Sequence, residues 1–299
     1  MQVQLLVGDR KGRFPGSNCL LIKGARTRVL VDAGCRRDQI HGVKHSIDAV
    51  VYTHIHPDHI TYHELLEGVP SYIPAYDASF PTIQEMAKRY APPYWRDWIS
   101  YIKAVFNLES LPVAHKVYDA WDTIKIGDVV IDAIPAYGHT KGHHVFIIGS
   151  HVHLADIDLT SFGPWYGHPE SSIENIIADI KMVHELGGKS HTTSHKELLY
   201  NSDQVSEALN RYKYALCRQF TNTLMVLRGL VPSTPQEMVN MGAIYKRKIP
   251  GAEKVMEYFE YEMITKILDF LVAKGIVGKN REGYYLKRDI DEETCYSML

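Results

Sequence analysis

Three histidines and one aspartate stand within a six-residue stretch of this sequence. The stretch, His54–His59, has the sequence His-Ile-His-Pro-Asp-His and follows the apolar run Ala49–Tyr52. Such a run predicts a buried strand, so we expect the cluster where a central strand ends and a loop begins. Imidazoles and a carboxylate together form a ligand set that suits zinc, manganese or iron. One such cluster cannot surround two metal ions, so the rest of the chain should supply further ligands.

The composition is that of an ordinary globular protein. Of 299 residues, 45% are hydrophobic and 23% are charged, and the formal net charge is −2 with histidine neutral. This balance gives no sign of broad attraction to nucleic acid or to membranes, and no apolar run predicts a membrane span. Residues 2–8 predict a first strand rather than a signal peptide. The 4 cysteines are widely spaced and form no C-x-x-C pair, which favours reduced thiols and a cytoplasmic protein.

Short strands dominate the first two thirds of the chain. Apolar patterns predict strands at 2–8, 18–23, 27–32, 47–53, 115–118, 122–126, 128–135, 144–149, 151–156 and 189–195. Helices are expected at about 58–66 and 171–186, the second with Ser171 as its N-cap. Strand runs separated by helices predict a domain of layered sheets and helices.

Residues 74–112 interrupt this pattern with aromatic side chains at mostly helical spacing. We predict two helices here, at about 79–90 and 94–107, separated by the Pro92-Pro93 pair. An aromatic stripe is more often core than a ligand site. Because the segment follows the His54–His59 cluster, it is also a candidate wall of a substrate cleft.

After Tyr200 the composition becomes helical. Helices are expected at 203–228, 235–245 and 252–274, and a β-hairpin at 275–286. This is the outline of a winged-helix module, which binds DNA in some proteins and packs or dimerises in others. Residues 201–299 contain 14 Lys and Arg against 13 Asp and Glu, whereas nucleic-acid-binding modules usually show a basic face. We therefore divide the chain into a catalytic domain, 1–199, and a winged-helix-like module, 200–299.

The pattern His54-x-His56-x-Asp58-His59, followed by His139, Asp156 and His195 at predicted strand ends, resembles the metallo-β-lactamase superfamily. The resemblance covers about residues 1–199 and includes Asp32 at an early strand end. It implies an α+β fold in which a four-layer αββα sandwich precedes the winged-helix-like module. The Gly-His-Thr-x-Gly-His form of residues 138–143 is similar to the glyoxalase-II-like and lactonase-like branches. The winged-helix outline is similar to the lactamase-beta-like endoribonucleases.

The resemblance implies a site for two divalent metal ions, with zinc expected first and iron or manganese as alternatives. The first ion would be held by His54, His56 and His139, the second by Asp58, His59 and His195, and Asp156 would bridge them. Extended backbone places His54 and His56 on one face, which agrees with this division. Asp58 and His59 follow Pro57, where the chain turns, and can reach a different ion.

Two of these positions have a rival. Asp158 lies two residues after Asp156 and is an alternative bridge, and His191 competes with His195. Asp32 is expected to accept a hydrogen bond from a ligand imidazole, which would fix the tautomer of that ring and raise its basicity.

The ligand set implies a dinuclear metal-dependent hydrolase. A metal-activated hydroxide would attack an ester, thioester or lactone small-molecule substrate, and Asp58 or Asp156 would take up a proton. Candidate substrate contacts are Lys141, Trp165, Tyr166 and His168. Two alternatives are a metal-dependent endoribonuclease or phosphodiesterase, and a ligand-sensing regulator that binds nucleic acid. We expect a small-molecule partner rather than nucleic acid and no membrane contact, and we leave a homodimer open.

Overall fold

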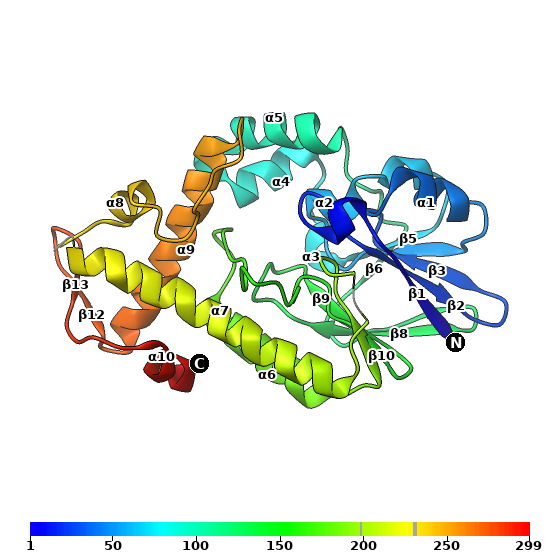
Figure 1. The fold of residues 1–299 in the computed structure, drawn as a ribbon. Helices are drawn as coiled ribbons and strands as arrows, with labels where there is room; N and C mark the ends of the chain where they lie inside the picture. Colours follow the sequence, from blue (N-terminus) through cyan, green and yellow to red (C-terminus); the bar gives the residue numbers. More distant parts are fainter. Residues whose placement is uncertain (198, 230–231) are drawn as a thin grey trace.

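The molecule, a computed structural model that describes residues 1–197, 199–229 and 232–299, contains two large β-sheets in one half and a helical C-terminal segment in the other (Figure 1). The strands of the first sheet are β1 (Gln2–Leu6), β2 (Cys19–Lys23), β3 (Arg28–Val31), β4 (Ala49–Val51), β5 (Ser71–Pro74) and β6 (Lys116–Tyr118), in that order. The second sheet contains β7 (Thr123–Ile126), β8 (Val129–Pro135), β9 (His144–Ile148), β10 (His151–His153) and β11 (Ser190–Thr192). Its spatial order is β11-β10-β9-β8-β7.

The helices that accompany the first sheet are α1 (Arg37–Val43), α2 (Pro57–Ile60), α3 (Ala75–Ala78), α4 (Ile83–Tyr90) and α5 (Trp95–Phe106). The later helices are α6 (Ile173–Leu186), α7 (Ser202–Gly229), α8 (Pro235–Asn240), α9 (Glu253–Ala273) and α10 (Glu292–Met298). Between α9 and α10 lies the antiparallel hairpin of β12 (Val277–Lys279) and β13 (Tyr284–Leu286). Short 3-10 helices occupy Asp9–Gly12, His63–Leu66 and Pro92–Tyr94.

Alternating side chains place the two sheets face to face. In β2, Leu20 and Ile22 join a buried cluster with Ile131 and Phe146 of the second sheet, so these residues fill the space between the sheets. Leu21, one position along, belongs to a different cluster on the opposite face. Since successive side chains of a strand point to opposite faces, β2 is buried on both sides. That pattern requires a further layer outside the first sheet.

Helices supply the outer layers on both sides. The outer face of the first sheet packs against α1, α4 and α5, where Ile40, Met86 and Ile102 are buried. The outer face of the second sheet shares a cluster with α6, α7 and α9, in which Val152 and Phe220 are both buried. The layers therefore run helix, sheet, sheet, helix, as the resemblance to the metallo-β-lactamase superfamily implies.

The helical C-terminal segment packs into the same core as the second sheet. Leu209 and Leu216 of α7 and Ile264 of α9 are buried in one cluster with Val145 of β9. Figure 1 shows α7 running beside α6, and α9 rising to meet α5 at the far end. No helix of the described ranges is both long and apolar enough to cross a membrane. The boundary at residue 199 stays a prediction, because this core continues across it.

Some elements differ from the sequence-based expectation. Strand β5 was not expected, since its Ser-Tyr-Ile-Pro sequence is short and ends in proline; parallel pairing with β4 and β6 supports it. Helix α1 was also missed, and it buries only Ile40, too few apolar residues for a periodic signal. The N-cap of α6 is Ser172 rather than Ser171, because the Ser172 side chain accepts the hydrogen bond from the Asn175 backbone. The helix expected at 58–66 is instead α2 followed by a 3-10 turn.

Candidate metal centre

The His54–His59 cluster crosses from extended backbone into a helix. Strand β4 ends at Val51, and His56 keeps extended angles, with φ −60° and ψ 149°, as the N-cap of α2. Pro57 occupies the first helical position, where its fixed φ suits the helix and its missing N–H is not needed. The turn therefore points Asp58 and His59 in a different direction from His54.

Two groups of side chains gather at this edge of the sheets. The ligand atoms within each group lie within 4.8 Å of one another. The first group consists of His54, His56, His139 and Asp156, and the second of Asp58, His59 and His195. The structure thus brings together, in two sets, the seven side chains that the sequence singles out.

The carboxylate of Asp156 lies between the two groups. Its Oδ2 is 3.3 Å from His139 Nε2 and 3.9 Å from His54 Nε2. Its Oδ1 is 2.9 Å from His59 Nε2 and 3.3 Å from His195 Nε2. Because each oxygen faces a different group, Asp156 has the orientation that a bridging ligand requires.

The rival residues point elsewhere. Asp158 Oδ1 accepts a hydrogen bond of 3.0 Å from the Thr160 backbone N–H, and burial raises the pKa of this carboxyl to about 6. His191 Nε2 lies 2.7 Å from the Gly187 carbonyl oxygen. Among the described residues, neither belongs to a ligand group.

In three ligand rings, Nδ1 points away from the site and lies within hydrogen-bonding distance of a protein oxygen. The distances are 2.9 Å from His59 Nδ1 to Asp32 Oδ2, 2.8 Å from His195 Nδ1 to the Gly12 carbonyl, and 3.0 Å from His139 Nδ1 to the Trp165 carbonyl. Each acceptor makes Nδ1 the protonated nitrogen, so the lone pair of Nε2 points into the site. These contacts therefore orient the three rings with Nε2 towards the site.

His56 is held by another histidine. Its Nε2 lies 2.9 Å from Nε2 of His168, whose Nδ1 lies 3.2 Å from the Tyr90 carbonyl oxygen. Because His168 donates from Nδ1, its Nε2 accepts from His56, and Nδ1 of His56 faces the site, 2.9 Å from His139 Nε2. The His168 ring stacks on Tyr90 at 4.0 Å and is 2% exposed. His168 is also among the residues that line the large cavity over the site, so the predicted substrate contact stays a prediction beside the orienting contact to His56.

Asp32 connects two parts of the cluster. Its carboxylate accepts hydrogen bonds from Thr53 N at 2.8 Å and Thr53 Oγ1 at 2.9 Å, besides the contact to His59. Its backbone has φ 61°, a left-handed conformation that aspartate tolerates better than most residues. The Asp32 side chain is fully buried, so these contacts compensate for the loss of water.

Several buried polar atoms between the two ligand groups have no hydrogen bond within the described part of the chain, and their chemistry shows whether a metal ion would fit there. His54 Nε2, His59 Nε2 and Asp156 Oδ1 are buried, and none makes a hydrogen bond of normal geometry to a described residue, although His59 Nε2 and Asp156 Oδ1 lie 2.9 Å apart. A buried polar atom without a partner costs about 1–3 kcal/mol, and these three converge between the ligand groups. Imidazole and carboxylate donors are those that zinc, iron and manganese accept, so the residues fit a pair of divalent ions.

The electrostatics of the site favour a cation. Burial lowers the pKa of His59 and His195, but the carboxylates around them outweigh it, and Asp156 contributes most to the net rise. The pKa of His195 reaches about 10. A field that stabilises a bound proton also stabilises a metal ion. At His54 and His56 burial dominates, and the pKa of each falls well below its ordinary value, which keeps these rings neutral as ligands.

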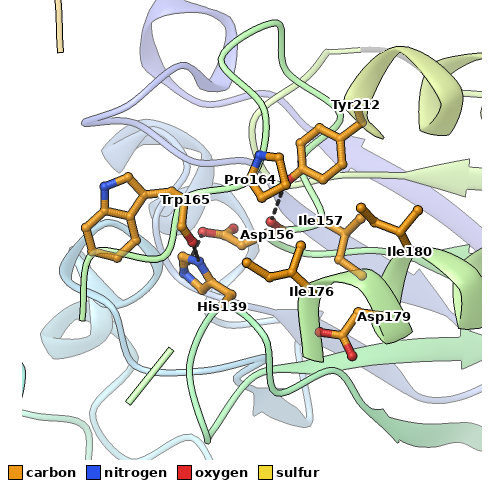
Figure 2. Close-up of a pocket in the computed structure, with 9 residues that line it drawn as sticks. All are labelled: His139, Asp156, Ile157, Pro164, Trp165, Ile176, Asp179, Ile180 and Tyr212. Carbon is orange, nitrogen blue, oxygen red and sulfur yellow. Dashed lines mark hydrogen bonds and ion pairs between the residues drawn. The ribbon is translucent and has the colours of Figure 1, made fainter. Parts of the chain in front are cut away.

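A small cavity lies behind His139 and Asp156 (Figure 2). Its volume of about 10 Å³ is enough for roughly one water molecule. Figure 2 shows the Tyr212 hydroxyl reaching the Asp156 carbonyl oxygen, a distance of 3.4 Å. Asp179 accepts a hydrogen bond of 2.7 Å from the Gly138 backbone N–H, so this side of the centre supports the loop that carries His139.

A much larger cavity opens over the metal-binding groups. Its volume is about 740 Å³, within the usual range for small-molecule sites. Its floor includes His56, Asp58, His139, Asp156 and His195. Helix α5, from the aromatic segment that the sequence marked as a candidate wall, contributes Trp98, Tyr101, Ile102 and Phe106.

Residues of the C-terminal segment also line this cavity, and sequence reasoning missed them. They are Tyr245, Arg247, Ile249, Ala252, Val255, Met256 and Phe259. The available signal in the sequence was the compact basic trio Lys246-Arg247-Lys248. Trp165 lines the cavity as expected and its Nε1 donates to the Tyr245 hydroxyl at 2.6 Å. That bond ties the loop after Asp156 to the C-terminal segment.

Two expected substrate contacts lie away from the cavity. Lys141 is exposed and is not among the described residues that line it. Tyr166 is fully buried, and its hydroxyl donates to Gln219 Oε1 at 2.7 Å. A direct substrate contact at either residue stays a prediction.

Comparisons with known proteins agree with this architecture. Residues 27–149 match the family model of the beta-lactamase superfamily domain. A metallo-beta-lactamase family protein from Thermus thermophilus has a similar structure, with TM-score 0.69 and 16% identity over 95% of this chain and 98% of that one.

Two further structures are similar. A beta-lactamase domain protein from Burkholderia ambifaria has TM-score 0.66 and 15% identity over 90% of this chain and 88% of that one. An archaeal metallo-beta-lactamase superfamily protein from Sulfolobus tokodaii has TM-score 0.52 and 17% identity over 70% of this chain and 85% of that one. No curated protein matches by sequence. The structures from Thermus thermophilus and Burkholderia ambifaria match at least 90% of this chain, so the shared fold includes the C-terminal segment.

Proposed function

Since residues 27–149 match the beta-lactamase superfamily domain and the chain has the metallo-β-lactamase fold, we propose that the protein is a dinuclear metal-dependent hydrolase. The observation that carries the proposal is the pair of ligand groups with Asp156 between them, on the floor of a cavity of about 740 Å³. A structural metal site is normally closed on all sides, whereas this one faces a space large enough for a substrate.

Seven residues would hold the ions in the division described above. Bound divalent ions supply Lewis acidity, which lowers the pKa of water towards about 7 and polarises the carbonyl of an ester, thioester or lactone. The carboxylates of Asp58 and Asp156 face the same space and are our candidates for holding the transferred proton. Asp32 and His168 keep their partner imidazoles in the ligating tautomer.

Zinc is the ion that we propose first, because four-coordinate imidazole and carboxylate sites suit it and it needs no redox partner. All 4 cysteines are free and buried, which supports our proposal of a reducing, cytoplasmic setting. The helices and the β12–β13 hairpin support a winged-helix-like outline for residues 200–299. In this proposal the segment serves as a wall of the substrate cavity rather than as a nucleic-acid reader.

The test combines metal analysis with a substrate panel. Purified protein should contain about two equivalents of a transition metal and should turn over thioesters, esters or lactones. His56→Ala should lower both metal content and kcat/KM, the latter by about a thousandfold, which corresponds to the several kcal/mol that Lewis acids supply. His184→Ala, at an exposed position of α6, is the matched control.

A different panel result would contradict the proposal. Metal-free protein with full activity would exclude metal-dependent hydrolysis. Turnover of RNA or phosphodiesters alone, with affinity that falls steeply as salt rises, would establish the nuclease alternative.

A further inference from the structure

The two long walls of the large cavity are apolar. Trp98, Ile102 and Phe106 come from α5, and Val255, Met256 and Phe259 from α9. The two helices contact one another directly, and Phe259 packs edge-on against Trp98 with ring centroids 6.4 Å apart. A surface of this kind favours a hydrocarbon chain, since each buried CH₂ contributes about 0.8 kcal/mol.

Three cationic side chains also line the cavity. They are Arg13, Lys196 and Arg247, and none of them forms an ion pair with a described residue. Their basic neighbours behave differently. Lys11 pairs with Glu197 at 2.9 Å, and Lys248 pairs with Glu257 at 2.7 Å. Of these five cations, the three without an ion-pair partner are those that line the cavity, although Lys246, which has no such partner among the described residues either, does not line it.

The three cations come from separate parts of the chain. Arg13 belongs to the loop after β1, Lys196 follows the ligand His195, and Arg247 precedes α9. The acidic groups of the cavity, Asp58, Asp156 and Asp158, are at the metal-binding floor or directly follow it in sequence. A substrate that satisfies all of these surfaces needs an apolar part, an anionic part and a reactive carbonyl.

We propose that the cavity binds an ester or thioester that carries an apolar acyl chain and an anionic alcohol or thiol portion. The chain lies between α5 and α9, and the anion is bound by Arg247 together with Arg13 and Lys196. Hydrolysis adds one water, breaks the acyl C–O or C–S bond, and releases a carboxylic acid and an anionic alcohol or thiol. No further reactant is needed. This inference rests on the proposed hydrolase function.

Matched thioesters test the substrate class. Acetyl, hexanoyl and decanoyl thioesters of 2-sulfanylethanesulfonate are compared with those of the neutral 2-sulfanylethanol. We expect kcat/KM to rise by at least about tenfold from acetyl to decanoyl, because methylene burial is favourable. The sulfonate series should exceed the neutral one by about three- to tenfold, as expected for a partly exposed charge-assisted contact.

Arg247→Gln should lower kcat/KM for the sulfonate series by about threefold or more relative to the neutral series, and so remove most of the preference for the sulfonate. Lys246→Gln changes an exposed neighbour that does not line the cavity, so it should retain the preference. Equal turnover across chain lengths, or an unchanged sulfonate preference in Arg247→Gln, would overturn the inference while leaving the hydrolase function intact.

A thioether that cannot be hydrolysed separates binding from catalysis. Binding of 2-(decylsulfanyl)ethanesulfonate is followed through tryptophan fluorescence, because Trp98 and Trp165 line the cavity. It should bind more tightly than its ethyl analogue, and more weakly to Arg247→Gln. If the decyl thioether binds as expected but metal-loaded protein hydrolyses no thioester, the proposed hydrolase function fails and the assignment of the binding cavity stands. If it does not bind, the binding assignment fails.

Discussion

The metal-binding floor and the cavity wall above it are built in different ways. On the floor, His59, His139 and His195 are almost fully buried, and each has its outer nitrogen held by a protein oxygen. The wall is made of apolar faces from α5 and α9, with exposed Arg13 and Arg247 among them. Ligand geometry demands fixed ring orientations, whereas apolar recognition is nearly non-directional. Chemistry and substrate preference should therefore respond to different mutations.

The largest effect should come from removing the metal-binding carboxylate. Asp156→Ala, or treatment of the wild type with a chelator, should lower kcat/KM by at least about a thousandfold for every thioester, short or long. Binding of 2-(decylsulfanyl)ethanesulfonate should persist, because the wall is unchanged. Asp203→Ala, at an exposed position of α7, is the control. Loss of activity towards long chains alone would contradict the separation of floor and wall.

Next in size are changes to the residues that orient the ligands. Asp32→Ala removes the acceptor of His59, and His168→Ala removes that of His56. Each should weaken zinc affinity by about 10–100-fold, measured by competition with a chromophoric chelator. Asp38→Ala, in an exposed ion pair with Arg36, should leave the affinity unchanged. An unaltered zinc affinity in both variants would show that the rings are held by packing alone.

A smaller effect concerns Asp179, which supports the loop that carries His139. Burial raises the pKa of its carboxyl to about 7, although the Gly138 N–H opposes this rise. The folded state therefore keeps a proton on Asp179 at pH values where the unfolded chain has already released it, because the carboxyl of the unfolded chain has an ordinary pKa of about 3.9. This contribution to stability is complete below about pH 4 and is lost as the pH rises through about 7.

The free energy of unfolding of the wild type should therefore fall between pH 4 and pH 8. In Asp179→Asn, which cannot titrate at this position, the fall should be smaller by about 2 kcal/mol. Urea denaturation at both pH values gives the difference. Because Asp179 is below the floor, the relative turnover of short and long thioesters should not change. Parallel pH curves for the two proteins would contradict the assignment.

The smallest effect should come from filling the wall. Met256→Trp places a larger side chain between α9 and the cavity and should reduce kcat/KM for the decanoyl thioester by about fivefold, or roughly 1 kcal/mol of lost chain burial. The acetyl thioester should be affected little. Met225→Trp, on an exposed part of α7, controls for the added indole. Equal losses for both thioesters would imply that the wall and the floor are coupled.

Much of the floor could be predicted from the sequence because its signals are local. The spacing of His54, His56, Asp58 and His59 depends only on how a strand turns into a helix, and Pro57 marks that turn. Strands β2, β3 and β8 were predicted within two residues at each end from their apolar patterns. In contrast, β5 depends on pairing with its neighbours, which no local pattern reports.

The sequence by itself determined the residue types of the candidate site, because metal-ligand chemistry depends on residue identity and short spacing. The tertiary structure decided what surrounds them. His168 lies 112 residues from His56, and only the fold brings their Nε2 atoms to 2.9 Å from one another. Arg247 and Met256 reach the cavity because α9 packs against α5. Such contacts join distant segments through burial, so they follow from the assembled core and not from local patterns.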